Sequence, residues 1–311
     1  MLRLFCLFTL FFVASAQAEV RVLTSIKPLQ LIAAAVQDGI GEPEVLLPPG
    51  ASPHHYALRP SDVRRVRDAD LLYWIGPDME AFLPRVLGSR EKPQVAVQDL
   101  PGMTLRHFGE SHEEDDHDDH DHEHAHAGDD LGHDHDHRPG SLDAHLWLAA
   151  DNAKVIAARM AADLAKLDTA NAGRYAANLK AFEARLDVLD GRIRPQLAAL
   201  QGKPYFVFHE AFDYFEAAYG LKHAGVFSVL TEVQPGARHV AAMRERLQQA
   251  GPSCVFSEPP LRPRLAETLT AGLPVKLAEL DALGGALPVD ASGYEQLLEN
   301  LAGGLSECLN S

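Results

Sequence analysis

The sequence has no excess of basic residues, and this absence excludes several classes of protein. Its 311 residues carry 28 lysines and arginines against 44 aspartates and glutamates, a formal net charge of −16. Thirteen of these acids lie in residues 110–137, so the rest of the chain carries a net charge of only −3. Such a body offers no basic face to nucleic acid and no polybasic patch to a membrane. We therefore expect no nucleic-acid partner.

The sequence also lacks an apolar run long enough to cross a bilayer near its start. An apolar run at residues 4–13 follows Arg3 and leads to the small residues Ala16-Gln17-Ala18. This order is typical of a secretory signal peptide, with cleavage expected before Glu19. The run is too short for a retained anchor, which needs about 20 residues. The sequence thus predicts a signal peptide at residues 1–18 and no direct membrane insertion.

Cysteine is scarce, with three residues in the whole chain. Cys6 lies in the predicted signal peptide, which leaves Cys254 and Cys308 in an exported, oxidising environment. Two cysteines in such a compartment predict a disulfide, which contributes about 4 kcal/mol in the chain-entropy treatment. Two separate buried thiols are the alternative.

Residues 110–137 contain neither lysine nor arginine, but they hold nine histidines and thirteen carboxylates. This composition cannot form a packed core, so we expect a mobile surface loop. Dense imidazole and carboxylate indicate divalent metal binding, since imidazole suits zinc, copper and nickel. The alternative is a solvated acidic segment without a metal role. The histidines are His112, His117, His120, His122, His124, His126, His133, His135 and His137.

Apolar runs of strand length alternate with helical patterns in both halves of the chain. Such an order predicts an α/β protein whose mainly parallel sheets are flanked by helices on both faces. The expected strands are residues 20–26, 45–47, 71–75 and 95–97 in the first half, and 205–208, 225–227, 254–257 and 275–280 in the second. Helices are expected at residues 29–36 and 61–67, and between the strands of the second half, notably at 237–250. A further helix is expected to begin near Asp151, with an apolar face formed by Ile156, Met160, Leu164 and Leu167.

A long helical pattern separates the two halves. Its apolar positions from Tyr175 to Ile193 are spaced alternately by four and three residues, which predicts one amphipathic helix with a buried stripe. We therefore expect two α/β lobes joined by a long rigid helix. The predicted division is an N-terminal lobe at 19–168, which contains the 110–137 loop, a linking helix at 169–200 and a C-terminal lobe at 201–311.

Four candidate metal ligands follow predicted strands or loops at comparable places: His54, His145, His209 and Asp281. In open parallel sheets, ligands bind beyond the carboxyl ends of the strands. Two facing lobes would bring these side chains together, and three imidazoles with a carboxylate or water make a tetrahedral site suited to Zn²⁺. The sequence lacks a short-spaced H-E-x-x-H motif, so each residue by itself is a weak signal.

Four motifs resemble those of the periplasmic zinc-binding proteins of ABC importers, the ZnuA type. They are GASPHHYALRPSD at 50–62, DAHLWL at 143–148, FHEAFDYF at 208–215 and LDALG at 280–284. Together with the acidic histidine-rich segment, these motifs extend over nearly all of the predicted mature chain. The resemblance implies metal held between two lobes that move little, a periplasmic location, a monomer and a membrane permease as partner.

The resemblance also implies roles for particular residues. His54, His145 and His209 match the three ligand histidines, and His209 favours zinc because manganese-binding relatives typically carry glutamate there. Pro53 stands where close relatives can carry a glutamate ligand, so the fourth ligand would be Asp281 or water. His55 would lie beside the site without binding the metal. Cys254 and Cys308 match a disulfide known in the zinc subgroup.

These observations favour a binding protein without catalysis, with Zn²⁺ as the transported ligand and the histidine-rich loop as a weaker zinc-binding or sensing segment. Two alternatives remain. In a secreted zinc hydrolase, Glu210 or Glu258 would act as general base for a metal-bound water. In a periplasmic metal buffer, residues 110–137 would be the functional part and the lobes would carry them.

Overall fold

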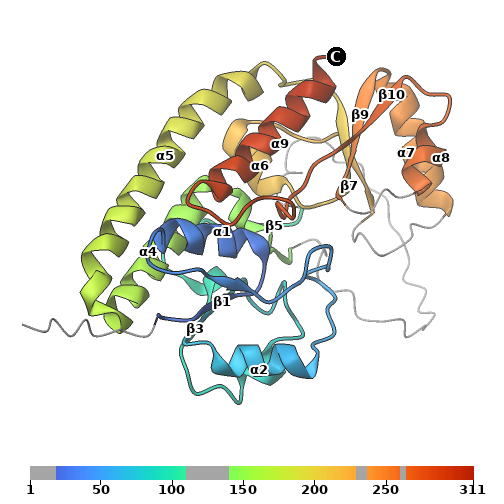
Figure 1. Ribbon diagram of the computed structural model, residues 1–311. Coiled ribbons are helices and arrows are strands. Elements are labelled where there is room, and N and C mark those ends of the chain that lie inside the picture. The colour runs from blue at the N-terminus through green and yellow to red at the C-terminus, as the bar shows by residue number, and fades with distance from the viewer. Residues whose placement is uncertain (1–18, 110–139, 229–236, 260–263) are drawn as a thin grey trace, which may run out of the picture.

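The computed structural model describes residues 19–109, 140–228, 237–259 and 264–311 (Figure 1). The predicted signal peptide at 1–18 and the histidine-rich segment at 110–137 lie outside the described residues. Among the helices that are described, none has an apolar stretch long enough to cross a membrane.

The first sheet is parallel throughout, as the sequence predicts. Its strand order is β2 (Glu44–Val45), β1 (Val22–Thr24), β3 (Leu71–Trp74) and β4 (Gln94–Ala96). The central strand β3 is buried at every position, as expected for a parallel strand with both faces covered. All four predicted strands are confirmed; three are shorter than expected, and β4 has the expected length but begins one residue earlier.

The second sheet is also parallel throughout, with the order β10 (Val275–Glu279), β9 (Ser253–Ser257), β7 (Tyr205–His209) and β8 (Gly225–Ser228). Strands β7 and β9 are buried along their whole length. The predicted α/β fold with parallel sheets is therefore confirmed. A short antiparallel pair, β5 (Arg106–His107) and β6 (Leu142–Asp143), was not predicted.

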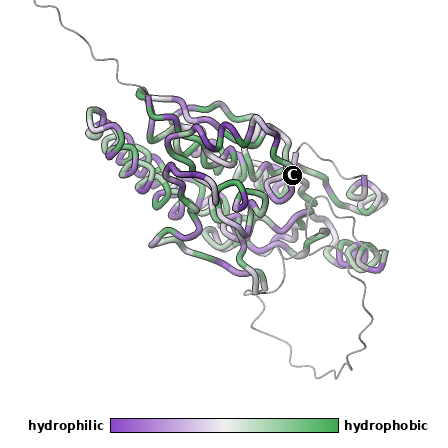
Figure 2. The backbone as a smooth tube through the Cα atoms, turned by 90° about the horizontal axis from the view of Figure 1, so that it is seen from below, coloured by the Kyte–Doolittle hydropathy of each residue, from purple (hydrophilic) through white to green (hydrophobic). Residues whose placement is uncertain are grey.

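Helices flank both sheets. Those expected from the sequence are α1 (Lys27–Val36), α2 (Pro60–Asp68), α4 (Ala150–Leu167), α5 (Ala172–Ala198) and α7 (Ala237–Ala250). Helices α6 (Asp213–Tyr219) and α8 (Arg264–Thr270) lie between strands of the second half, where helices were expected without bounds, whereas α3 (Pro84–Leu87) and α9 (Gly293–Leu309) were not predicted. In Figure 2 the long helices carry both hydrophobic and hydrophilic residues, as expected where a helix buries only one face.

Helix α5 links the two sheet regions along one edge of the molecule (Figure 1). Its 27 residues bury Tyr175, Phe182, Leu186, Leu189 and Ile193, which confirms the predicted stripe. The helix continues through Pro195 for one further turn. Proline has no backbone N–H, so the carbonyl of Gly191, four residues earlier, lacks its helical donor, while the remaining bonds of the helix can form.

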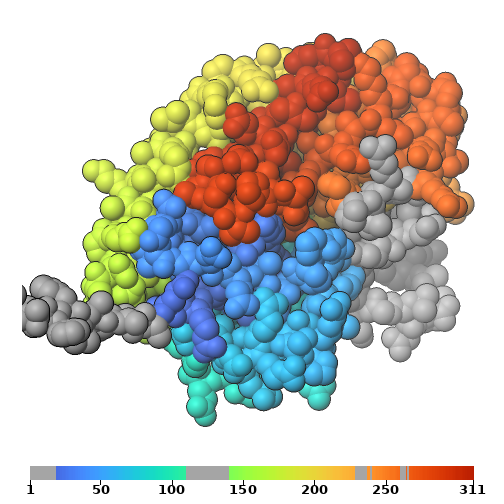
Figure 3. Space-filling model, in the orientation of Figure 1, coloured from blue at the N-terminus to red at the C-terminus, as the bar shows by residue number. Residues whose placement is uncertain are grey.

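Helix α9 belongs to the second half of the sequence but packs against α1 and α5. At its start, a Cβ on Gly293 would lie 2.7 Å from a methyl group of Leu31 and 2.8 Å from the backbone carbonyl oxygen of Pro288, so a larger residue would force the backbone to shift. Figure 3 shows the red C-terminal segment directly against the blue N-terminal one. Buried apolar residues of both halves consequently form one continuous core cluster. The predicted division at residues 168 and 200 stays a prediction.

A disulfide joins Cys254 in β9 to Cys308 near the end of α9, with the two Cα atoms 6.2 Å apart. The predicted pairing is therefore confirmed. It fixes the last turn of α9 to the second sheet, while the first turn of the same helix contacts α1. Helix α9 is thus held at both ends.

Candidate metal centre

His54 lies in the loop between β2 and α2, beyond the carboxyl end of the first sheet. Backbone hydrogen bonds from Leu46 to Thr24 and from Leu47 to Ser25 continue the pairing past β2, before two prolines end it. The His54 backbone N–H donates to the Ser52 hydroxyl at 3.3 Å, and the histidine is only 5% exposed. The loop therefore turns His54 into the protein interior.

His145 follows β6 by two residues and is oriented by Asp143. Its Nδ1 lies 2.7 Å from Asp143 Oδ1, and the same oxygen accepts the His145 backbone N–H at 3.0 Å. Burial raises the pKa of Asp143 well above its usual range, although the hydrogen bond from the His145 backbone opposes the shift. A positive charge nearby would favour the ionised form of this carboxyl.

His209 is the last residue of β7 and is oriented by Glu258, which follows β9. The His209 Nδ1 atom lies 2.8 Å from Glu258 Oε1. An imidazole that donates its Nδ1 proton to a carboxylate carries its lone pair on Nε2, the nitrogen that can bind a metal. His145 and His209 thus have the same arrangement, each with its own acid.

The structure brings the three histidines together. Their ring centroids are 5.3 Å apart for His54 and His145, 5.4 Å for His54 and His209, and 5.0 Å for His145 and His209. One ligand nitrogen from each ring lies within 4.8 Å of the other two, and all three residues are buried. They line a cavity of about 840 Å³, which we call the cleft. This geometry allows one cation to contact all three rings.

Asp281 follows β10 and lines the same cleft, but it is not part of the three-histidine group. Its carboxylate accepts backbone N–H groups of Leu283, Gly284 and Gly285 at 2.8 to 2.9 Å. Each carboxylate oxygen has two lone pairs, so these bonds do not use its full capacity. Asp281 could still bind a cation. His55 also lines the cleft and is exposed.

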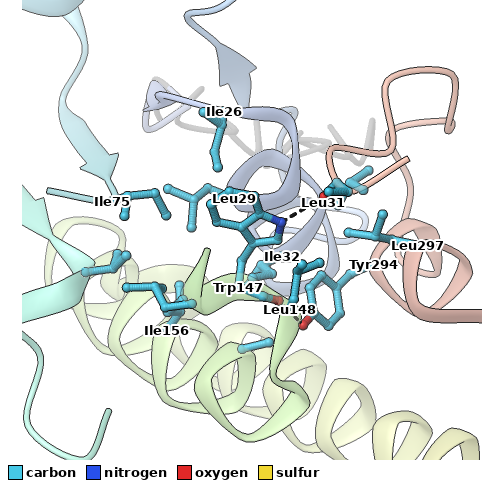
Figure 4. Close-up of a cluster of buried hydrophobic side chains, with 14 of the residues drawn as sticks. Ile26, Leu29, Leu31, Ile32, Ile75, Trp147, Leu148, Ile156, Tyr294 and Leu297 are labelled. Atoms are coloured by element: carbon cyan, nitrogen blue, oxygen red, sulfur yellow. Dashed lines mark hydrogen bonds between the residues drawn. The ribbon is translucent and has the colours of Figure 1, made fainter. Parts of the chain in front are cut away.

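A chain of buried contacts attaches the Asp281 loop to the first half of the protein. The Trp147 indole N–H donates to the Ala282 carbonyl at 2.8 Å, and the Tyr294 hydroxyl donates to the Trp147 carbonyl at 2.5 Å. Figure 4 shows Trp147 beside Tyr294 among residues of α1 and α4. The two sides of the cleft are therefore held together by packed side chains as well as by backbone.

The family of periplasmic zinc-uptake complex component A proteins matches residues 22–308. The chain belongs to this family. A high-affinity zinc uptake system protein ZnuA of Yersinia pestis is 42% identical over 94% of this chain and 92% of its own length. The protein of the same name in Brucella suis is 38% identical over 93% and 91%. A crystal structure of ZnuA, 20% identical, superposes with a TM-score of 0.74 over 94% of this chain and 100% of that one, which supports the fold.

The sequence alone did not identify Asp143 and Glu258 as the residues that position His145 and His209. Asp143 stands two residues before His145, so its place in the motif was an available signal. Glu258 was considered only as a general base, and nothing in the sequence pairs it with His209, 49 residues away. Glu210, the other candidate base, lines a different cavity from the cleft. Burial raises the pKa of Glu210, and the charge of Asp213 adds to the shift.

The nine histidines of residues 110–137 lie outside the described residues, but the points where the chain leaves and returns are described. Strand β5 pairs antiparallel with β6, so Arg106 lies opposite Asp143 and His107 opposite Leu142. The chain therefore returns two residues before His145. The described strands on either side of this segment, β5 and β6, thus lie next to His145 in the chain and in space.

Proposed function

We propose that this periplasmic protein captures Zn²⁺ in the cleft and delivers it to the membrane permease of an ABC importer. His54, His145 and His209 bind the metal, and Asp281 or water takes the fourth position. Membership of the zinc-uptake family and the names of the relatives support the cargo. The observation that carries the proposal is the convergence of three buried imidazoles, of which His54 and His209 lie at the carboxyl ends of the two parallel sheets and His145 follows β6.

The donor set supports zinc as the ion. Nitrogen ligands suit Zn²⁺, whereas Mn²⁺ prefers oxygen and binds more weakly to a given site of this kind. The carboxylates beside His145 and His209 fix the orientation of the two imidazole rings and increase their basicity. Residues that hydrogen-bond to histidine ligands have this effect in zinc sites. Preorganised ligands need no ordering when the metal arrives, which favours tight binding.

The same geometry argues against a hydrolase. Glu210 lines another cavity, and Glu258, which does line the cleft, already accepts a hydrogen bond from His209 Nδ1, so its carboxylate serves to orient a ligand. The protein acts by binding and releasing the ion. It works as a monomer that meets the permease, and residues 110–137 provide additional, weaker zinc sites.

Deletion of residues 110–137 tests this division of roles. We expect calorimetric zinc titration of the deletion variant to show one high-affinity site retained and several weaker ones lost. The reason is that a segment without a core must lose conformational entropy to chelate a metal. Loss of all tight binding would favour the metal buffer, and the cleft assignment would then be wrong.

A further inference from the structure

A second group of metal-ligating side chains lies outside the cleft. Glu210, Asp213 and His223 each place one ligand atom within 4.8 Å of the other two. They line a cavity of about 360 Å³ that shares no lining residue with the cleft. We propose that these three residues form a second divalent-cation site, which takes Zn²⁺ more weakly than the cleft does. The proposal does not depend on the assignment of the cleft.

The orientation of His223 supports a ligand role. Its Nδ1 atom lies 2.9 Å and 3.1 Å from the two carboxylate oxygens of Glu216, which is only 4% exposed. The Tyr205 hydroxyl donates to Glu216 at 2.6 Å and fixes this carboxylate in turn. With its Nδ1 proton directed at Glu216, His223 carries its lone pair on Nε2. His145 and His209 show the same pairing of imidazole with acid.

The three residues lie on one short segment of the chain, between the end of β7 and the start of β8. Glu210 follows the end of β7, and Asp213 begins α6 three residues later. His223 lies in the connection from α6 to β8, the strand that pairs with β7. The parallel register places His223 near the amino end of β7 and Glu210 at its carboxyl end, so the side chains, and not the strand pairing, bring the three ligand atoms within 4.8 Å of one another.

The surroundings predict weaker and less selective binding than in the cleft. One nitrogen and two carboxylate donors form a mixed set, which discriminates less sharply between zinc and oxygen-preferring cations such as Mn²⁺. The ligands are partly exposed, unlike the buried cleft histidines. Three basic side chains, Arg106, Lys222 and Arg246, line the same cavity and compete with a cation for the acids.

Anomalous diffraction from crystals of the full chain grown with zinc chloride tests the site directly. Data collected on both sides of the zinc absorption edge should give one peak among Glu210, Asp213 and His223 and a separate peak among the cleft histidines. A filled cleft with no second peak at excess zinc would overturn the inference. A second peak with an empty cleft would instead overturn the proposed function and the order of affinities, while the second site itself would stand.

Two variants identify the ligands, and one serves as a matched control. His223→Gln and Asp213→Asn should each abolish the second peak and retain the cleft peak, which also reports that the variant is folded. Asp38→Asn changes an exposed acid that lines neither cavity and should keep both peaks. Equilibrium dialysis of the full chain should show one zinc ion fewer in each ligand variant than in the control. A second peak that persists in both ligand variants, or an equal zinc content, would contradict the assignment.

Discussion

His209 and Glu210 are neighbours in the sequence, yet they line two different cavities. His209 ends β7 and meets two further imidazoles in a buried cleft, whereas Glu210 joins Asp213 and His223 in a partly exposed cavity. Successive side chains at a strand end point to opposite sides, so one strand can supply ligands to two separate sites. In both groups an acid orients a histidine. The two groups therefore differ in the chemistry of their donor atoms and in burial.

The two groups should differ most in their response to protons. Each ligand imidazole must be neutral to bind metal, and the pKa of an unperturbed histidine is about 6.5. Well below that pH, up to three protons compete with one ion in the cleft, so the logarithm of affinity should fall by as much as ~3 per pH unit. The second group has one imidazole and should show a slope near one in the same range.

Chelator competition between pH 5 and 7 measures the slope, on the variant without residues 110–137 because their nine histidines titrate in the same range. Affinity must fall as pH falls, since protonation removes the lone pair. A cleft slope near one would mean that a single histidine competes with the proton there. Such a result would remove the main difference between the two groups.

Substitution of a cleft ligand should have the next largest effect. His209→Ala should weaken cleft binding by more than the roughly 10- to 100-fold expected when a partner of a ligand is lost. His55→Ala is the matched control, because His55 is exposed at the edge of the same cleft and should leave the affinity nearly unchanged. Competition with a chromophoric chelator gives both values. Equal losses in the two variants would contradict the choice of ligands.

Substitution of an orienting acid should have the smallest effect of the three. Glu258→Ala removes the acceptor for His209 Nδ1 and should weaken cleft binding by about 10- to 100-fold. Glu258→Gln keeps an oxygen at this position and should lose less. Zinc affinity at pH 7.5, measured by the same competition, compares the two. If Glu258→Ala bound zinc as tightly as the unmodified protein, the acid would not orient His209, and the parallel with Glu216 and His223 would fail.

Most of the fold could be predicted because the local signals were strong. Buried parallel strands such as β3 and β7 are continuous apolar runs, and α5 carries a regular apolar stripe. Helix α9 was missed although it is long, since the chain before it is rich in small residues and the pattern begins at Gly293 without a capping side chain. Short helices such as α3 and α6 have too few residues for a periodic pattern to be read.

The sequence by itself determined the α/β class, the parallel sheets, the linking helix, the cysteine pair and the three histidines that meet in the cleft. These follow from local periodicity, from composition and from motifs at the ends of strands. Only the tertiary structure decided which acid orients each imidazole and that α9 packs across both halves. It also decided that Glu210 turns away from His209 toward His223. These contacts join residues far apart in the chain, or depend on which side of a strand a residue faces, and no short stretch of sequence records either.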